Sequence, residues 1–176
     1  NVSYGDGGYM EPTPGKKNTK AYATRVPTPK FVTKPGFYFG EENKKISLSC
    51  DMEGAVIYYT TNGSTPTEES KLYEGPIEIS DNKPIRAKAF VEGQLASDVL
   101  TGTFILKSPY SESCTGKDLP VVSIVTDDEF LNDDEIGICV KGTNGVAGPS
   151  SCVSSKANYN RDWNRPAYFE YFENGD

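Results

Sequence analysis

Hydrophobic and polar residues alternate in several short runs between residues 26 and 106. Apolar side chains occupy every second position from Ile46 to Met52 and again from Ile85 to Val91. A period of two places one face of a β-strand in a core and the other face in solvent. Three further short runs rich in apolar and β-branched residues lie between turn signals: Val56–Thr61, Ile77–Ile79 and Val99–Leu106. About six or seven strands in roughly 80 residues, with no convincing helix, predict a β-sandwich.

One of these runs contains two adjacent tyrosines, Tyr58 and Tyr59. Neighbouring side chains of a strand point to opposite faces, so we expect one ring in the core and the other on the surface. Asn62-Gly63 follows directly, and this pair favours the left-handed turn of a hairpin. The pattern therefore predicts that the chain folds back at Asn62.

Turn-rich segments flank the predicted sandwich. Residues 1–25 contain Gly-Asp-Gly-Gly and Pro-Thr-Pro-Gly and show no apolar periodicity, and residues 107–118 contain Ser-Pro-Tyr-Ser. Both segments are predicted to be loops or linkers.

The pattern changes after residue 118. Residues 119–125 form an almost continuous apolar run, LPVVSIV, which is typical of a strand buried on both faces. We predict a helical turn around Phe130 and Leu131, and further strands at 137–140 and 167–172. A partial sheet of about three strands, with no long helix to cover it, is marginal in water. We therefore expect residues 119–176 to pack against the sandwich or to pair with another chain through open strand edges.

Charge and composition exclude several classes of function. The 176 residues include 18 Lys and Arg against 25 Asp and Glu, which gives a formal net charge of −7, and they include no His. An acidic balance argues against nucleic-acid binding, which needs a basic patch. No apolar run is long enough for a membrane-spanning helix. Without His, the chain cannot by itself form a Ser-His-Asp or Cys-His catalytic site or a His-containing zinc site.

The sandwich segment, residues 26–106, resembles the chitobiase/beta-hexosaminidase C-terminal-like domain. The resemblance rests on IYYTTNGSTPT at 57–67, on YEGPI at 73–77 and on IRAKAF at 85–90. It implies an all-β, immunoglobulin-like β-sandwich of the kind common in secreted bacterial proteins.

Residues 119–176 resemble the start of a CotH-type (spore coat) kinase-like domain. LPVVSIVTDDEFLNDDEIGICVKG at 119–142 is similar to the first hairpin of that family, and ANYNRDWNRPAYFEYFENGD at 157–176 is similar to its Asn-Tyr-Asn-x-Asp-Trp-x-Arg-Pro strand. GYMEPTPGKKN at 8–18 is similar to the end of a lamin-tail-like domain. Together these resemblances imply a slice of a larger secreted protein. The catalytic groups of the kinase-like family lie beyond the positions matched here, so we assign no catalytic residue.

Four cysteines are present, without the C-x-x-C spacing of a zinc knuckle. An even number in a Tyr-, Thr- and Gly-rich chain suggests disulfides and an extracellular setting, with three full pairings open. Buried free thiols in a cytosolic protein are the alternative. We favour Cys139–Cys152, since closing a loop of about 15 residues stabilises by about 3 kcal/mol in the chain-entropy picture. Cys50–Cys114 is the second expected bond. Cys50 shares the face of Ile46 and Leu48, so a free buried thiol is its alternative.

The acidic stretch after residue 126 is a candidate calcium site. Carboxylate oxygens are the ligands that calcium prefers, and four are offered by Asp127, Asp128, Asp133 and Asp134. Their spacing lacks the order of an EF-hand. A solvated acidic turn is the alternative.

Aromatic side chains and sequons give the remaining candidate sites. Rings that can stack on sugars are those of Tyr38, Tyr58, Tyr73 and Trp163. Trp163 lies between Arg161 and Arg165, so it also fits a packed corner in which a guanidinium stacks on the ring. Asn1-Val2-Ser3 and Asn62-Gly63-Ser64 match the N-glycosylation sequon.

These observations favour a non-catalytic, extracellular structural or spacer module of a secreted or cell-surface protein. We expect no cofactor unless calcium binds. The expected partners are neighbouring domains of the same protein, a second copy through edge strands, and a polysaccharide. The alternatives are the N-terminal part of a CotH-type kinase and a carbohydrate-binding module.

Overall fold

The computed structural model describes residues 3–5, 8–10, 21–22, 24–107, 120–143 and 156–173. The chain forms two compact units, one of residues 1–119 with 172–176 and the other of residues 120–171. Within the described ranges, the helical elements are a single turn, α1 (Glu129–Asn132), and a 3-10 turn, η1 (Asn158–Asn160). The prediction of an all-β, immunoglobulin-like fold is confirmed.

The larger layer of the sandwich is a five-stranded sheet in the order β5-β12-β11-β8-β9. Its neighbouring strands are antiparallel except for β5 and β12, which run parallel. The strands are β5 (Gly36–Phe37), β8 (Val56–Thr60), β9 (Lys71–Leu72), β11 (Lys83–Phe90) and β12 (Leu100–Ile105).

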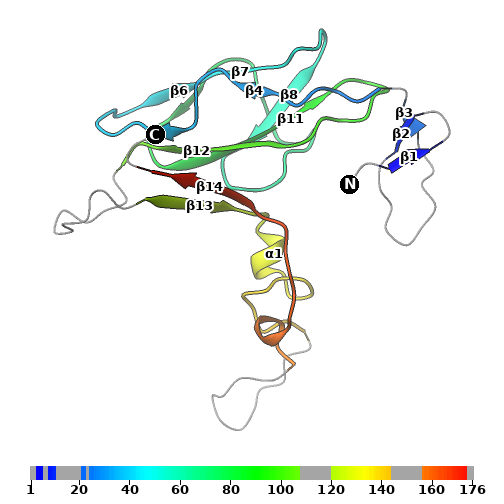
Figure 1. The fold of residues 1–176 in the computed structure, drawn as a ribbon, viewed down its shortest axis with the longest axis vertical. Coiled ribbons are helices and arrows are strands. Elements are labelled where there is room, and N and C mark those ends of the chain that lie inside the picture. Colours follow the sequence, from blue (N-terminus) through cyan, green and yellow to red (C-terminus); the bar gives the residue numbers. More distant parts are fainter. Residues whose placement is uncertain are drawn as a thin grey trace. The chain divides into compact units, whose positions relative to one another are not determined.

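The opposite layer consists of two short strand pairs, β4 (Lys30–Phe31) with β7 (Leu48–Ser49) and β6 (Lys44–Ile46) with β10 (Ile77–Ile79). Only Ser47 separates β6 from β7 along the chain. Its N–H donates to Thr33 Oγ1 at 3.0 Å, and its carbonyl accepts from Val32 N at 2.9 Å, so the break stays hydrogen-bonded. Figure 1 shows β4, β6 and β7 lying across the sheet that contains β8, β11 and β12.

One hydrophobic core fills the space between the layers. Its buried members are Val26, Ile46, Leu48, Ile57, Ile77, Ile79, Ile85, Ala87, Ala89, Phe104 and Leu106. Cys50 and Met52 pack against this core, as their alternation with polar residues predicts. Tyr59 packs against the core as well, whereas the Tyr58 ring meets Phe90 edge-on at a centroid distance of 5.6 Å. The alternation therefore identified the core face correctly.

The hairpin predicted after β8 is present, since β8 pairs antiparallel with β9, but its loop is much longer than the two residues Asn62-Gly63. Gly63 does have a positive φ of 88°, but β8 pairs with β9, which begins only at Lys71. The chain runs on because the intervening loop has its own anchors: Pro66 is fully buried, and Arg86 Nη1 donates to Gly63 O at 2.7 Å.

The prediction that residues 1–25 are only loop and linker is also wrong. They contain a three-stranded antiparallel sheet of β1 (Ser3–Gly5), β2 (Gly8–Met10) and β3 (Ala21–Tyr22). These strands are too short to show a hydrophobic period. The sequence between β1 and β2 is Asp6-Gly7, a pair that favours a two-residue hairpin turn, and this signal was available.

After the sandwich, β13 (Val121–Val125) pairs with β14 (Tyr168–Phe172), close to two of the predicted strands. The helical turn predicted around Phe130 is present as α1. Residues 137–140 are not a strand, which corrects that prediction. Their backbone is bonded to the helical turn instead, because Ile138 N donates to Phe130 O and Cys139 N to Leu131 O, each at 2.9 Å.

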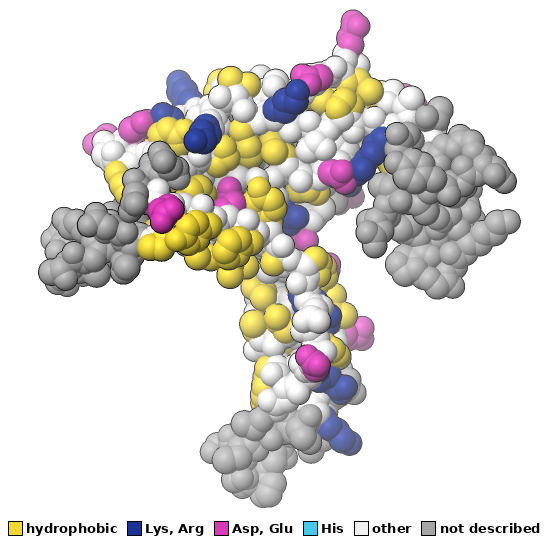
Figure 2. Space-filling model, in the orientation of Figure 1, with side chains coloured by type: hydrophobic (Ala, Val, Ile, Leu, Met, Phe, Trp, Pro, Cys, Tyr) yellow, Lys and Arg dark blue, Asp and Glu magenta, His cyan; other side chains and the backbone are white. Residues whose placement is uncertain are grey.

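The prediction that the run at 119–125 is buried on both faces is wrong. Val125 is buried, but Val122 is 49% exposed and Ile124 is 66% exposed. On β14, Phe169 is 62% exposed and Tyr171 53%. Figure 2 shows apolar side chains gathered over β13 and β14. In a sheet of two strands the alternate side chains remain at the surface, so a continuous apolar run does not secure burial.

Candidate functional site

The chain is held where it joins the sandwich from the N-terminal side. Val26 N donates to Leu95 O at 2.9 Å, and Leu95 N donates to Thr24 O at 3.1 Å, around a parallel bridge between Arg25 and Leu95. The Thr24 hydroxyl adds a hydrogen bond of 2.8 Å to Gln94 Oε1. We call this group, Thr24–Val26 with Gln94–Asp98, the N-terminal clamp.

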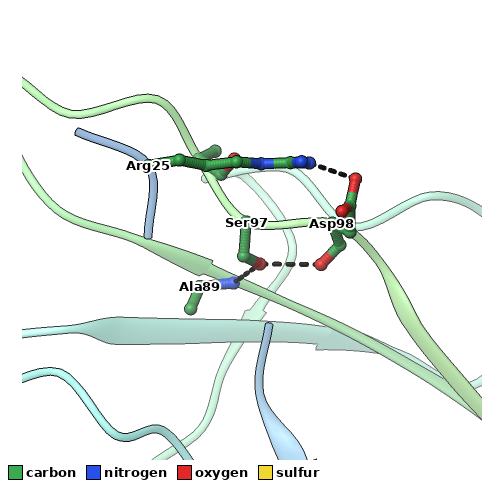
Figure 3. Close-up of polar contacts among 5 residues, drawn as sticks. Arg25, Ala89, Ser97 and Asp98 are labelled. Carbon is green, nitrogen blue, oxygen red and sulfur yellow. Dashed lines mark hydrogen bonds and ion pairs between the residues drawn. The ribbon is translucent and has the colours of Figure 1, made fainter. Parts of the chain in front are cut away.

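An ion pair and a buried serine complete this clamp (Figure 3). The Arg25 guanidinium pairs with the Asp98 carboxylate, and its Nε lies 3.5 Å from Ala96 O. Ser97 is 2% exposed, and its hydroxyl accepts from Ala89 N at 2.9 Å and donates to Asp98 O at 2.7 Å. Because Ala89 belongs to β11, the clamp is tied directly to the central sheet.

A second group of contacts, the C-terminal clamp, holds the chain where it leaves β12. Asn82 Oδ1 accepts from Leu106 N at 2.9 Å and from Lys107 N at 2.8 Å, and Asn82 Nδ2 donates to Lys107 O at 3.0 Å. One side chain thus satisfies three backbone groups, because an amide has an acceptor oxygen with two lone pairs and an NH₂ donor.

Charges reinforce the C-terminal clamp at the surface. Lys107 Nζ lies 3.4 Å from the Asp81 carboxylate. The pKa of Asp81 is held below its ordinary value, first by the hydrogen bond from Asn82 N–H and then by Lys107. The pair is exposed to solvent, so we count it as an orienting contact rather than a source of stability.

Two of the aromatic residues predicted to bind sugars are engaged in packing. Tyr38 stacks on Phe104 at 6.2 Å, carries Lys44 Nζ 3.9 Å above its ring, and donates from its hydroxyl to Lys34 O at 2.5 Å. Tyr73 packs against the core, and its hydroxyl accepts from Leu48 N at 2.9 Å. Both rings act as structural braces of the sandwich.

The other two predicted aromatic residues lie in different units. Tyr58 lies in the larger sheet beside Phe90. Trp163 belongs to the second unit, with Arg161 5.2 Å and Arg165 4.9 Å from its ring centre, which is the packed corner given as the alternative. The Arg165 side chain is fixed further by a 2.7 Å hydrogen bond from Nε to Ile136 O.

The acidic stretch uses its carboxylates for local contacts with backbone and side-chain N–H groups. Asp133 Oδ1 accepts from Glu135 N at 2.8 Å and Ile136 N at 3.0 Å, and these bonds hold the pKa of Asp133 below its ordinary value. Asp128 accepts from Asn132 Nδ2 at 2.6 Å. In the described part of the chain, no three His, Cys, Asp or Glu side chains gather into a group that could hold a metal ion. The calcium prediction for Asp127, Asp128, Asp133 and Asp134 therefore gains no support.

Each predicted disulfide includes a cysteine outside the described residues, Cys152 in one pair and Cys114 in the other. Both pairings stay predictions. Cys50 is half-buried, with Sγ 3.5 Å from Pro27 O, and Cys139 is exposed. Asn1 also lies outside the described residues. Asn62 is exposed, and its side-chain oxygen accepts from the Ser64 N–H at 3.2 Å and hydroxyl at 2.7 Å.

The residues of the two clamps were missed in the sequence. Asn82 and Lys107 lie 25 positions apart, and Arg25 and Asp98 lie 73 apart. No short sequence pattern identifies residues that far apart as hydrogen-bond partners. The only signal was the Asp81-Asn82 turn pair just before the strand that begins at Lys83.

Comparison with known proteins found one family model that matches part of the chain. Residues 33–101 match the family model of the chitobiase/beta-hexosaminidase C-terminal domain, a non-catalytic domain. The match covers less than half of the 176 residues, and the CotH-like and lamin-tail-like resemblances outside it stay predictions. A search of curated proteins found no match. None of the helices in the described ranges has the length and hydropathy needed to cross a membrane.

Proposed function

We propose that the sandwich, residues 24–107, is a non-catalytic spacer that holds the chain segments on its two sides in fixed directions. The proposal is carried by the two clamps. At both places where the chain joins the sandwich, several hydrogen bonds hold it in addition to the covalent backbone. A flexible linker would leave these residues free to rotate.

The strand order suits a module that transmits tension. β5 and β12, near the two ends of the domain, run parallel, with Phe104 opposite Gly36 and Ile105 opposite Phe37. Once the N-terminal clamp and the β4–β7 pair have opened, a pull on the segment before β5 and the segment after β12 acts along both strands in opposite directions. Their hydrogen bonds are then strained together instead of opening one after another.

We further propose that the spacer works in a secreted or cell-surface protein. The family match to a non-catalytic accessory domain supports this location, and so does the even number of cysteines in a Gly- and Tyr-rich chain. Neighbouring domains of the same protein are the partners that a spacer requires.

Backbone ¹⁵N relaxation of the whole chain tests the proposal. We expect heteronuclear NOE values at Arg25, Val26, Leu106 and Lys107 as high as those of β11, because hydrogen-bonded backbone is rigid on the ps–ns timescale. In Asn82→Ala the values at Leu106 and Lys107 should fall. The matched control is Asn43→Ala, which removes an exposed asparagine outside both clamps. Low values at the four positions in the unaltered chain would contradict the spacer function.

A further inference from the structure

A pocket of about 350 Å³ opens at the end of β8 where the long loop begins and returns. It lies within the family-matched domain and separate from both clamps. Seven residues from the two arms of the loop line it: Tyr59, Thr60, Thr61, Asn62, Glu69, Ser70 and Lys71.

The walls of the pocket are fixed before any ligand arrives. Thr60 Oγ1 donates to Ser64 O at 2.6 Å, and Asn62 Oδ1 accepts from Ser64 N–H and hydroxyl. On the returning arm, Ser70 Oγ accepts from Thr67 N at 2.9 Å and Ser70 N donates to Thr67 O at 3.0 Å. A preformed wall avoids the entropic cost of ordering a loop on binding.

The groups left for a ligand form a mixed polar set. Because Oδ1 of Asn62 is already bonded to Ser64, the amide NH₂ is the end that remains, with two donors. Within the described residues, neither the Glu69 carboxylate nor the Lys71 ammonium forms an ion pair. Tyr59, which is only partly buried by its packing against the core, adds an aromatic side chain to the lining.

This set gives no net advantage to an ion of either sign. Lys71 attracts an anion that Glu69 repels, and Glu69 attracts a cation that Lys71 repels. A ligand with several hydroxyls can bond to all three polar side chains, because each hydroxyl both donates and accepts. It can donate to Glu69 and accept from Lys71 or Asn62. The ring carbons of a sugar can also lie against the Tyr59 side chain.

We infer that this pocket binds one neutral sugar residue of a larger glycan. Its volume lies at the lower end of the range for ligand pockets, which suits a single ring. This site is not the one predicted from the sequence, which relied on other aromatic rings, among them Tyr58. The pocket uses Tyr59 and the polar residues of one loop. It is also independent of the spacer function.

Titration of the ¹⁵N-labelled chain with glucose, galactose, mannose and N-acetylglucosamine tests the inference by NMR. We expect at least one of these sugars to shift the amide signals of residues 59–62 and 69–71, with saturation. Glu69→Gln should raise Kd about tenfold or more, because a hydrogen bond to a charged group is among the stronger ones. The matched control is Glu68→Gln, which makes the same change one residue away, outside the pocket lining.

A second variant separates binding from loop structure. Asn62→Asp keeps an oxygen for Ser64 but removes the two amide donors, so binding should weaken while the Ser64 amide signal stays in place. Equal effects of Glu68→Gln and Glu69→Gln would overturn the site. Shifts caused by glycine or phosphate but by none of the four sugars would overturn the ligand class, and so would the absence of any saturable shift. None of these results bears on the clamps, so the spacer function is judged separately.

Discussion

Replacing Asn82 by alanine is the sharpest test of how the sandwich holds the chain after β12. The change removes three hydrogen bonds, two from backbone N–H groups and one to a backbone carbonyl. Leu106 is only 3% exposed, so its N–H would be left buried without a partner, at a cost of about 1–3 kcal/mol. Lys107 is exposed and water replaces its partner there, which adds about 0.5 kcal/mol. We expect a total loss of about 1.5–3.5 kcal/mol.

Native-state hydrogen exchange measures this loss locally. Exchange is preferable to a single unfolding curve, because a chain of two compact units need not unfold in one step. Protection of the Leu106 amide should fall by at least tenfold in Asn82→Ala. Asn82→Asp keeps oxygen acceptors for both amides and should retain most of the protection.

Asn43→Ala serves again as the control for the loss of an exposed asparagine. If Asn82→Ala leaves the Leu106 amide as protected as Asn43→Ala does, Asn82 does not hold this junction and the C-terminal clamp has been misinterpreted.

Three further predictions concern the core, the acidic turn and the second unit. Gly102→Ala would place a Cβ 2.5 Å from the Phe31 ring and should cost about 1–3 kcal/mol in denaturant unfolding, whereas Gly75→Ala, whose Cβ meets nothing within 4 Å, should cost much less. Because hydrogen bonds from Ile136 and Glu135 lower the pKa of Asp133, its carboxylate stabilises the turn fully above the unfolded pKa of about 4. This stabilisation is lost as the pH falls through the lower, folded pKa, so NMR should show the Glu135 amide signal moving only in acid. Self-association through β13 and β14 should appear as concentration-dependent sedimentation that Ile124→Lys reduces; a strict monomer would refute it.

The sequence by itself determined the core of the sandwich. The alternation at Ile46–Met52 and Ile85–Val91 identifies the buried face, because successive side chains of any strand point to opposite sides whatever it pairs with. The same local rule separates Tyr58 from Tyr59. The motifs at 57–67, 73–77 and 85–90 also identified the family that the comparison found for residues 33–101.

The tertiary structure decided how many neighbours each strand has. The run at 119–125 is apolar on both faces, yet Val122 and Ile124 remain exposed because β13 pairs with only one strand in the described part of the chain. An apolar sequence shows which side chains a strand is able to bury, and its neighbouring strands determine which of them are buried. Residues 137–140 have strand-like composition, but their backbone bonds to the helical turn α1.

Only the tertiary structure shows the clamps and the pocket. Asn82 reaches Leu106 and Lys107 because β11 and β12 are antiparallel neighbours, and Arg25 reaches Asp98 because the parallel bridge at Leu95 lays the incoming chain beside that loop. The pocket exists because β9 begins at Lys71 rather than directly after Asn62, which leaves two arms of a loop to face each other. Contacts between residues 25 or 73 positions apart have no local period, so they follow from the packing of the sheets and not from the pattern of the sequence.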